Sequence, residues 1–160
     1  MLQTESYARS AVEAARPTLA PDDADKAVAI RMTRQELFER ERPPRAWFII
    51  DESALLRQAA SPVTMRGQCE HLLAMGQRPE ITIQVIENSQ GMCCAFGRAY
   101  VILSFDHQGD LVYVEDVGTA RYVRKREDVD RYTLAFDHLR ASALPDGKSA
   151  ELIRRIAHDD

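Results

Sequence analysis

The sequence predicts an α+β protein, in which a mostly antiparallel sheet of about four to five strands is flanked by helices from both ends of the chain. Three observations predict this class. β-forming runs gather between residues 47 and 123, helical periodicities occupy both ends, and a short glycine-containing segment joins two strands as a hairpin loop would. The chain has 160 residues and no internal repeat or linker, so we expect one domain over residues 1–160.

Two helices open the chain. Thr4 is placed to cap a first helix, whose apolar stripe continues to Ala15 and which must end before Pro17. Pro21, followed by two aspartates, begins the second helix, which must end before the Pro43-Pro44 pair.

The middle of the chain alternates between strand and helix. The apolar run 47–50 is rich in β-formers and predicts a buried strand, and residues 53–58 suit a short helix. Ser61-Pro62 is a typical helix start, and Gly76 is the expected end of that helix. Residues 81–86 alternate for most of their length, which predicts a strand with one protected face, followed by a loop over 87–97.

The last third contains the hairpin. Strands are predicted over 99–105 and 111–117, joined by residues 106–110, and residues 121–123 suit a short final strand. Glu127-Asp128 begins the strongest helix of the sequence, which the segment 145–147 breaks. A short terminal helix then carries Leu152, Ile153 and Ile156.

Charge and composition exclude several classes of protein. Lys and Arg number 21 against 25 Asp and Glu, which gives a net charge of −4 and disfavours direct nucleic-acid binding by this domain. No apolar run approaches the roughly 18 residues of a membrane span, and the first residues lack the features of a signal peptide. The odd set Cys69, Cys93 and Cys94 favours reduced thiols and a cytoplasmic location.

Neither a cofactor nor a metal is expected. The glycines form no phosphate-binding pattern of the known kinds. The histidines His71, His107, His138 and His158 fall on different predicted elements, without the spacing of a metal site, so we interpret them as structural or surface residues.

The carboxylates suggest one candidate cleft. Alternation places Tyr113 and Glu115 on the same face of a strand, where Glu115 can serve as a base or bind a cation, and Asp51 can reach the same rim. The alternative is that Glu115 faces solvent or pairs with an arginine such as Arg57 or Arg121.

Two further features have both a chemical and a structural interpretation. Cys93 and Cys94 lie near Arg98 in a glycine-flanked loop. They are interpreted either as a reactive thiol site or as small apolar residues that fill a buried loop. The basic stretch 121–126 either contacts phosphate groups or forms a solvated connection between a strand and a helix.

Several segments together resemble the C-terminal domain of actinobacterial helix-turn-helix regulators, the WhiJ-like, antitoxin-like regulators abundant in Streptomyces. Residues 2–9 read LQTESYAR, close to that family's opening LLQTEDYAR. The family's GAHxGLGGPF loop is altered to GMCCAFGRAY at 91–100, with Cys93 in place of the histidine. The other matching segments are 29–35, 43–55, 68–73, 79–86, 112–115 and 127–132.

The resemblance implies a regulatory domain that binds a small molecule or a small partner protein, with no established catalytic residues. We expect its cleft over the sheet face of Tyr113 and Glu115. The candidate ligand-binding residues are Trp47, Asp51, Arg57, Cys93, Arg98, Tyr113 and Glu115.

Two alternatives stay open. One is an enzyme of a biosynthetic pathway, with Glu115 as base and Tyr113 or Arg98 orienting the substrate. The other is a homodimer, for which the terminal helix offers its apolar face.

Overall fold

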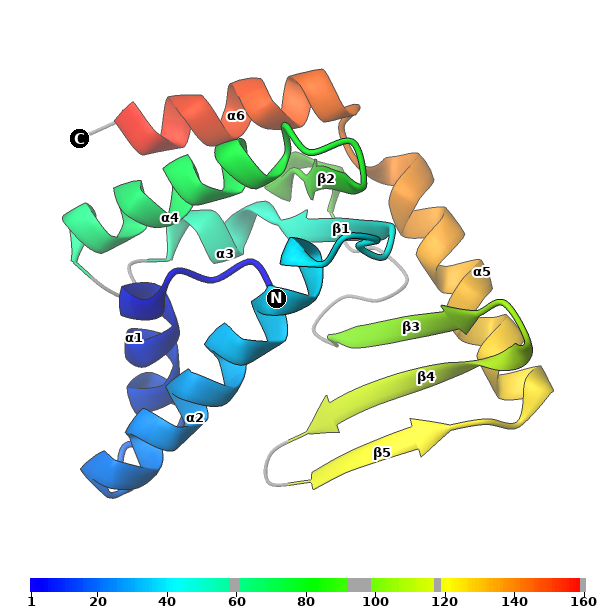
Figure 1. Ribbon diagram of the computed structural model, residues 1–160. Coiled ribbons are helices and arrows are strands. Elements are labelled where there is room, and N and C mark those ends of the chain that lie inside the picture. The colour runs from blue at the N-terminus through cyan, green and yellow to red at the C-terminus, as the bar shows by residue number, and fades with distance from the viewer. Residues whose placement is uncertain (58–60, 92–98, 117–118, 159–160) are drawn as a thin grey trace. The chain divides into compact units, whose positions relative to one another are not determined.

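The chain folds into two compact units. The computed structural model describes residues 1–57, 61–91, 99–116 and 119–158. The helical unit comprises Met1–Asn88 and Leu144–Asp160, and the sheet unit comprises Ser89–Ala143 (Figure 1). The sheet unit is thus a single stretch of chain set between the two segments of the helical unit. Among the described residues, no helix has both the length and the apolar character that crossing a membrane requires.

The helices of the helical unit begin where the capping residues predict. Thr4 Oγ1 accepts the Tyr7 N–H at 3.3 Å, and Ser61 Oγ accepts the Thr64 N–H at 3.2 Å. Both caps satisfy amide groups that have no partner inside their helix. The helices are α1 (Glu5–Ala15), α2 (Pro21–Thr33), α3 (Glu52–Leu56), α4 (Pro62–Met75) and α6 (Asp146–His158), with a 3₁₀ helix η1 (Arg34–Glu39) continuing α2.

The two strands of this unit run parallel, and here the predicted sheet is wrong. β1 (Ala46–Asp51) pairs with β2 (Ile81–Ile86) in parallel, in register Phe48↔Ile83. The antiparallel sheet of four to five strands is replaced by this parallel pair and a separate three-stranded antiparallel sheet. The reason lies in the connection: α3 and α4 occupy residues 52–75, which supplies the long crossover that parallel strands need.

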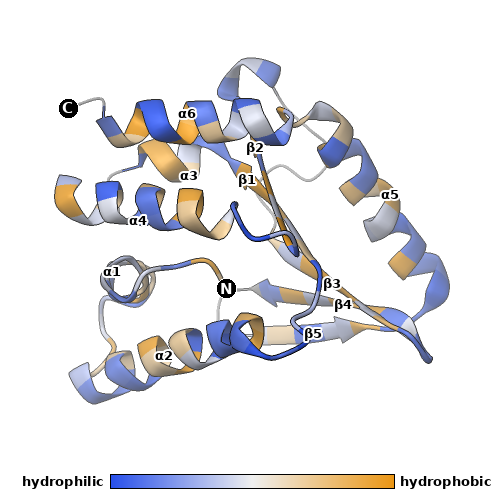
Figure 2. Ribbon diagram, turned by 45° about the horizontal axis from the view of Figure 1, so that its top comes forward, coloured by the Kyte–Doolittle hydropathy of each residue, from blue (hydrophilic) through white to orange (hydrophobic). Residues whose placement is uncertain are grey.

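Alternation along β1 and β2 defines the core of the helical unit. Phe48, Ile83 and the fully buried Val85 point to the face covered by helices, where they meet Leu72 of α4 and Ile153 of α6. Apolar and polar residues alternate along α6, as expected of a helix with one buried face (Figure 2). The apolar face of α6 therefore packs into the core of its own unit, so it does not offer the exposed surface that the homodimer alternative requires.

The outer edge of β2 is closed by the segment that leads into α6. The Leu144 N–H donates to the Val85 carbonyl at 2.9 Å, and the Val85 N–H donates to Ser149 Oγ at 3.0 Å. The Ser149 hydroxyl in turn donates to the Leu144 carbonyl at 3.1 Å. A buried strand edge would otherwise leave backbone groups without partners, so Ser149 completes the sheet with its side chain.

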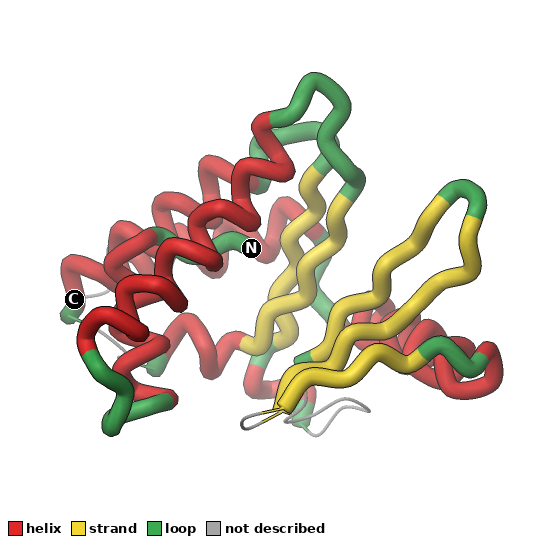
Figure 3. Tube along the Cα trace, turned by 60° about the horizontal axis from the view of Figure 1, so that its bottom comes forward, coloured by secondary structure: helices red, strands yellow, loops and turns green. Residues whose placement is uncertain are grey.

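The sheet unit is an antiparallel sheet with one helix (Figure 3). Its strands are β3 (Tyr100–Phe105), β4 (Gln108–Asp116) and β5 (Thr119–Val123), followed by α5 (Arg126–Ser142). The β3–β4 hairpin and the final strand are as predicted, although β4 begins at Gln108 and the register shifts between Leu103 and Phe105. The core of this unit is small: Val112 and Val114 of β4 pack with Val129 of α5.

Candidate functional site

The three-stranded sheet has one covered face and one open face. Val112, Val114 and Val123 point toward α5. The register places the intervening residues on the opposite face, because side chains alternate along a strand and paired residues share a side. We call this opposite surface the open sheet face; its residues outside the protein interior are Val101, Leu103, Phe105, Tyr113, Glu115 and Tyr122.

Large apolar side chains on the open sheet face are exposed. The exposed fraction is 39% for Leu103, 47% for Val101 and Phe105, and 61% for Tyr122. Tyr122 lies beside Tyr113 of the neighbouring strand, with ring centroids 5.3 Å apart. Single exposed apolar residues are common, but several gathered on one sheet face are typical of a binding surface.

The predicted placement of Tyr113 and Glu115 on one face is confirmed. Glu115 pairs with Ala120 in the register and is exposed. Arg121 cannot neutralise it, because Arg121 pairs with Val114 and therefore points to the α5 side. Among the described residues, no ion pair to Glu115 forms.

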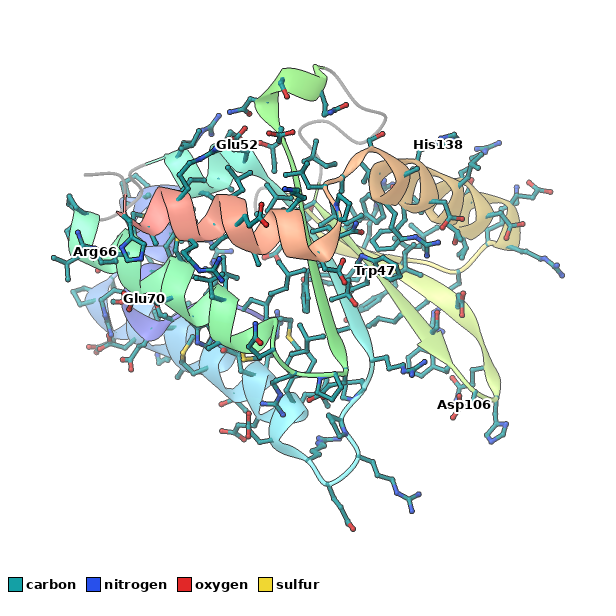
Figure 4. The ribbon with its side chains drawn as sticks, turned by 90° about the horizontal axis from the view of Figure 1, so that it is seen from above. Trp47, Glu52, Arg66, Glu70, Asp106 and His138 are labelled. Atoms are coloured by element: carbon teal, nitrogen blue, oxygen red, sulfur yellow. The ribbon has the colours of Figure 1, made fainter. Side chains whose placement is uncertain are left out.

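Three predicted site residues lie in the helical unit. Trp47 is on β1 (Figure 4), where its indole N–H donates to Gln84 Oε1 at 2.8 Å. Asp51 caps α3: its Oδ1 accepts the Ser53 N–H at 2.9 Å and the Ser53 hydroxyl. Arg57 is exposed just after α3.

The cleft predicted to join these residues with Tyr113 and Glu115 would draw on both units, and it stays a prediction. Cys93, Cys94 and Arg98 lie outside the described residues, as does the rest of the segment 92–98 of the altered loop. The contacts of Asp51 give it a structural role, because its Oδ1 caps the N-terminus of α3.

A groove on the α5 side of the sheet unit was not predicted. It has a volume of about 430 Å³ and lies between β5 and the first turns of α5. The basic stretch 121–126 is the signal that could have found it. This stretch runs from β5 through the short connection 124–125 to the start of α5, and alternation along β5 turns Arg121 toward α5. The lining residues are Arg121, Val123, Asp128, Arg131, Tyr132 and Ala135.

The described residues offer neither a cluster of metal ligands nor an activated thiol. No group of three or more His, Cys, Asp or Glu side chains gathers there in a way that could hold a metal ion. Burial, with a smaller contribution from Glu70, raises the pKa of the Cys69 thiol and keeps it protonated. Burial also lowers the pKa of His71, whose Nε2 is enclosed without a hydrogen-bond partner.

Taken by its fold and surfaces, this is an α+β protein with a well-packed helical unit and a small sheet unit that presents an open apolar face and a basic groove. The chain belongs to the DUF5753 family, described as a domain of unknown function, whose sequence pattern matches residues 1–155. No curated protein and no solved structure matches the chain.

Proposed function

We propose that the chain is a regulatory domain that binds a small partner protein through the open sheet face, in the manner of the domains attached to actinobacterial helix-turn-helix regulators. The observation that carries the proposal is the exposure of Val101, Leu103, Phe105 and Tyr122 on one sheet face whose opposite face is packed against α5. The sequence resemblance supports the kind of regulator and the kind of partner.

A protein fits this surface better than a small molecule does. Small ligands prefer concave sites that bury most of their surface. The apolar side chains here are instead spread across one face of the sheet, on its two edge strands β3 and β5. Aromatic residues are enriched at the centres of protein interfaces, and Tyr113 and Tyr122 already form a ring pair there. Among the described residues, Glu115 is the charged side chain that the register places beside Tyr113 on the open sheet face, so the partner is expected to present a mainly apolar surface.

The regulatory step would be a population shift. A partner that binds one arrangement of the regulator more tightly than another favours that arrangement by the difference in its binding free energies. In such a regulator the partner would thereby change the state of the attached DNA-binding segment.

The test is co-expression of the chain with the small proteins encoded beside its gene, followed by measurement of complex mass and affinity. We expect a defined complex that Phe105→Ser and Tyr122→Ser each weaken by about 2 kcal/mol, or roughly thirtyfold. Val63→Ser on α4 is the matched control, since Val63 is 81% exposed and lies in the helical unit. Absence of any complex, or equal weakening by the control, would contradict the proposal.

A further inference from the structure

The groove between β5 and α5 points to a second binding function. We propose that it binds a small organic anion, a carboxylate or phosphate group attached to an apolar body. The residues that would recognise the ligand are Arg121, Val123, Tyr132 and Ala135. This inference does not depend on the proposed function, because the groove lies on the α5 side of the sheet and the partner surface lies on the other.

Arg121 is the anion-binding group. Its guanidinium points toward α5, and its Nη2 donates to the Tyr132 hydroxyl at 3.4 Å. Across the described segments, no carboxylate forms an ion pair with Arg121. A guanidinium has five N–H donors in a planar fork that matches carboxylate and phosphate oxygens, so most of its donors remain for a ligand.

Tyr132 supplies the second donor. Because its hydroxyl oxygen accepts the bond from Arg121, its own proton is directed elsewhere. Its ring is held by Tyr100, with centroids 5.0 Å apart in an edge-to-face arrangement, and its carbonyl accepts the Tyr100 hydroxyl at 3.4 Å. The Tyr132 donor is therefore positioned before a ligand arrives.

The rest of the lining explains why the ligand has an apolar body. Val123 and Ala135 give the groove aliphatic surface, and its volume of about 430 Å³ is within the usual range for small-ligand sites. The one acidic residue of the lining, Asp128, accepts from Arg131 at 3.2 Å on α5, so its charge is offset by its own neighbour. The groove as a whole keeps one uncompensated positive charge, on Arg121.

The test is titration of the full chain with benzoate and with phenyl phosphate, followed by NMR. We expect saturable shifts of the Arg121 side-chain and Tyr132 signals, with benzoate and phenyl phosphate distinguishing a carboxylate from a phosphate preference. Acetate and inorganic phosphate serve as probes without the apolar body and should bind several-fold more weakly.

Variants decide whether the groove itself is responsible. Arg121→Gln should weaken binding about tenfold, and Tyr132→Phe by a smaller factor, because charge-assisted hydrogen bonds are the stronger ones. Arg126→Gln is the matched control: it removes the same charge nearby, from a side chain that is 94% exposed. Asp128→Asn should tighten binding, since it removes the only negative charge of the lining.

Two results would overturn the proposal. One is the absence of saturable shifts at Arg121 and Tyr132 with either aromatic probe. The other is equal weakening by Arg126→Gln and Arg121→Gln, which would mean that the anion responds to general surface charge. Circular dichroism of each variant confirms that the fold is intact. Loss of partner binding through Phe105→Ser would leave these results unchanged.

Discussion

The two units use their apolar side chains in opposite ways. The helical unit encloses Val85 and Ile153 and holds the buried side chain of Gln68 by two hydrogen bonds, one to the Leu2 carbonyl and one from the Thr4 N–H. The sheet unit packs one face of a three-stranded sheet and leaves Phe105 and Tyr122 exposed on the other. The comparison suggests that stability resides mainly in the first unit and recognition mainly in the second.

The largest expected effect is in the helical core. Ile153 is 2% exposed, so Ile153→Ala should lower the free energy of unfolding by about 2–5 kcal/mol through lost burial and an unfilled cavity. Denaturant titration can follow this, because the only tryptophan, Trp47, lies in the same unit. A loss below about 1 kcal/mol would show that the core is less well packed than its burial indicates.

The next effect tests the closed edge of β2. Ser149→Ala removes the acceptor for the Val85 N–H, and an enclosed donor without a partner costs about 1–3 kcal/mol. Ser142→Ala is the control, since that hydroxyl bonds the His138 carbonyl at an exposed position and should change stability by less than about 0.5 kcal/mol. Equal effects of the two substitutions would show that the Ser149 hydroxyl does not stabilise the edge of β2.

A pH effect distinguishes the units further. Burial lowers the pKa of His71 below its ordinary value of 6.5, so the unfolded chain binds this proton more tightly than the folded one. Stability should therefore be full above pH 6.5 and fall as the pH drops from there through the folded pKa. Below pH 4.5 the carboxyl of Glu80 adds a second loss, because its hydrogen bond with Arg78 lowers its pKa.

His71→Leu should abolish the part of the pH dependence that begins near 6.5, as measured by denaturation at several pH values. His138→Gln, at an exposed position of α5 (Figure 4), is the matched control. An unchanged profile in His71→Leu would show that another group is responsible.

The smallest expected effect is on the open sheet face. Phe105→Ser should change the free energy of unfolding by less than about 0.5 kcal/mol, because the side chain is already about half exposed. Thermal and denaturant melts measure this. A loss comparable to that of Ile153→Ala would mean that Phe105 belongs to a core, and the comparison between the units would fail.

Local signals in the sequence predicted most of the elements. The caps at Thr4 and Ser61 and the start at Pro21 depend on neighbouring residues, and each lies where it was predicted. The hairpin was also predicted, but its connection is shorter than the predicted 106–110, because β4 already begins at Gln108 and includes Gly109. The second helix was predicted to extend further, but it tightens to a 3₁₀ helix after Thr33.

Pairing between distant segments was not predicted. β1 and β2 were assigned to the same antiparallel sheet as the later strands, although the intervening helices already offered the length of a parallel crossover. The shared face of Tyr113 and Glu115 follows from alternation alone and was predicted correctly. The groove was missed because it requires knowing that Arg121 of β5 faces Tyr132 of α5, a relation between two elements that neither pattern contains.

The order of the units along the chain has a consequence for synthesis on the ribosome. All strands and the helix of the sheet unit have been made once Ala143 has emerged, whereas the helical unit still lacks α6. Until α6 has been made, the Val85 N–H lacks its acceptor, Ser149 Oγ, and Leu72 lacks its packing partner Ile153. We therefore expect the sheet unit to reach its native state first during translation, and the helical unit to complete its core only once α6 has emerged.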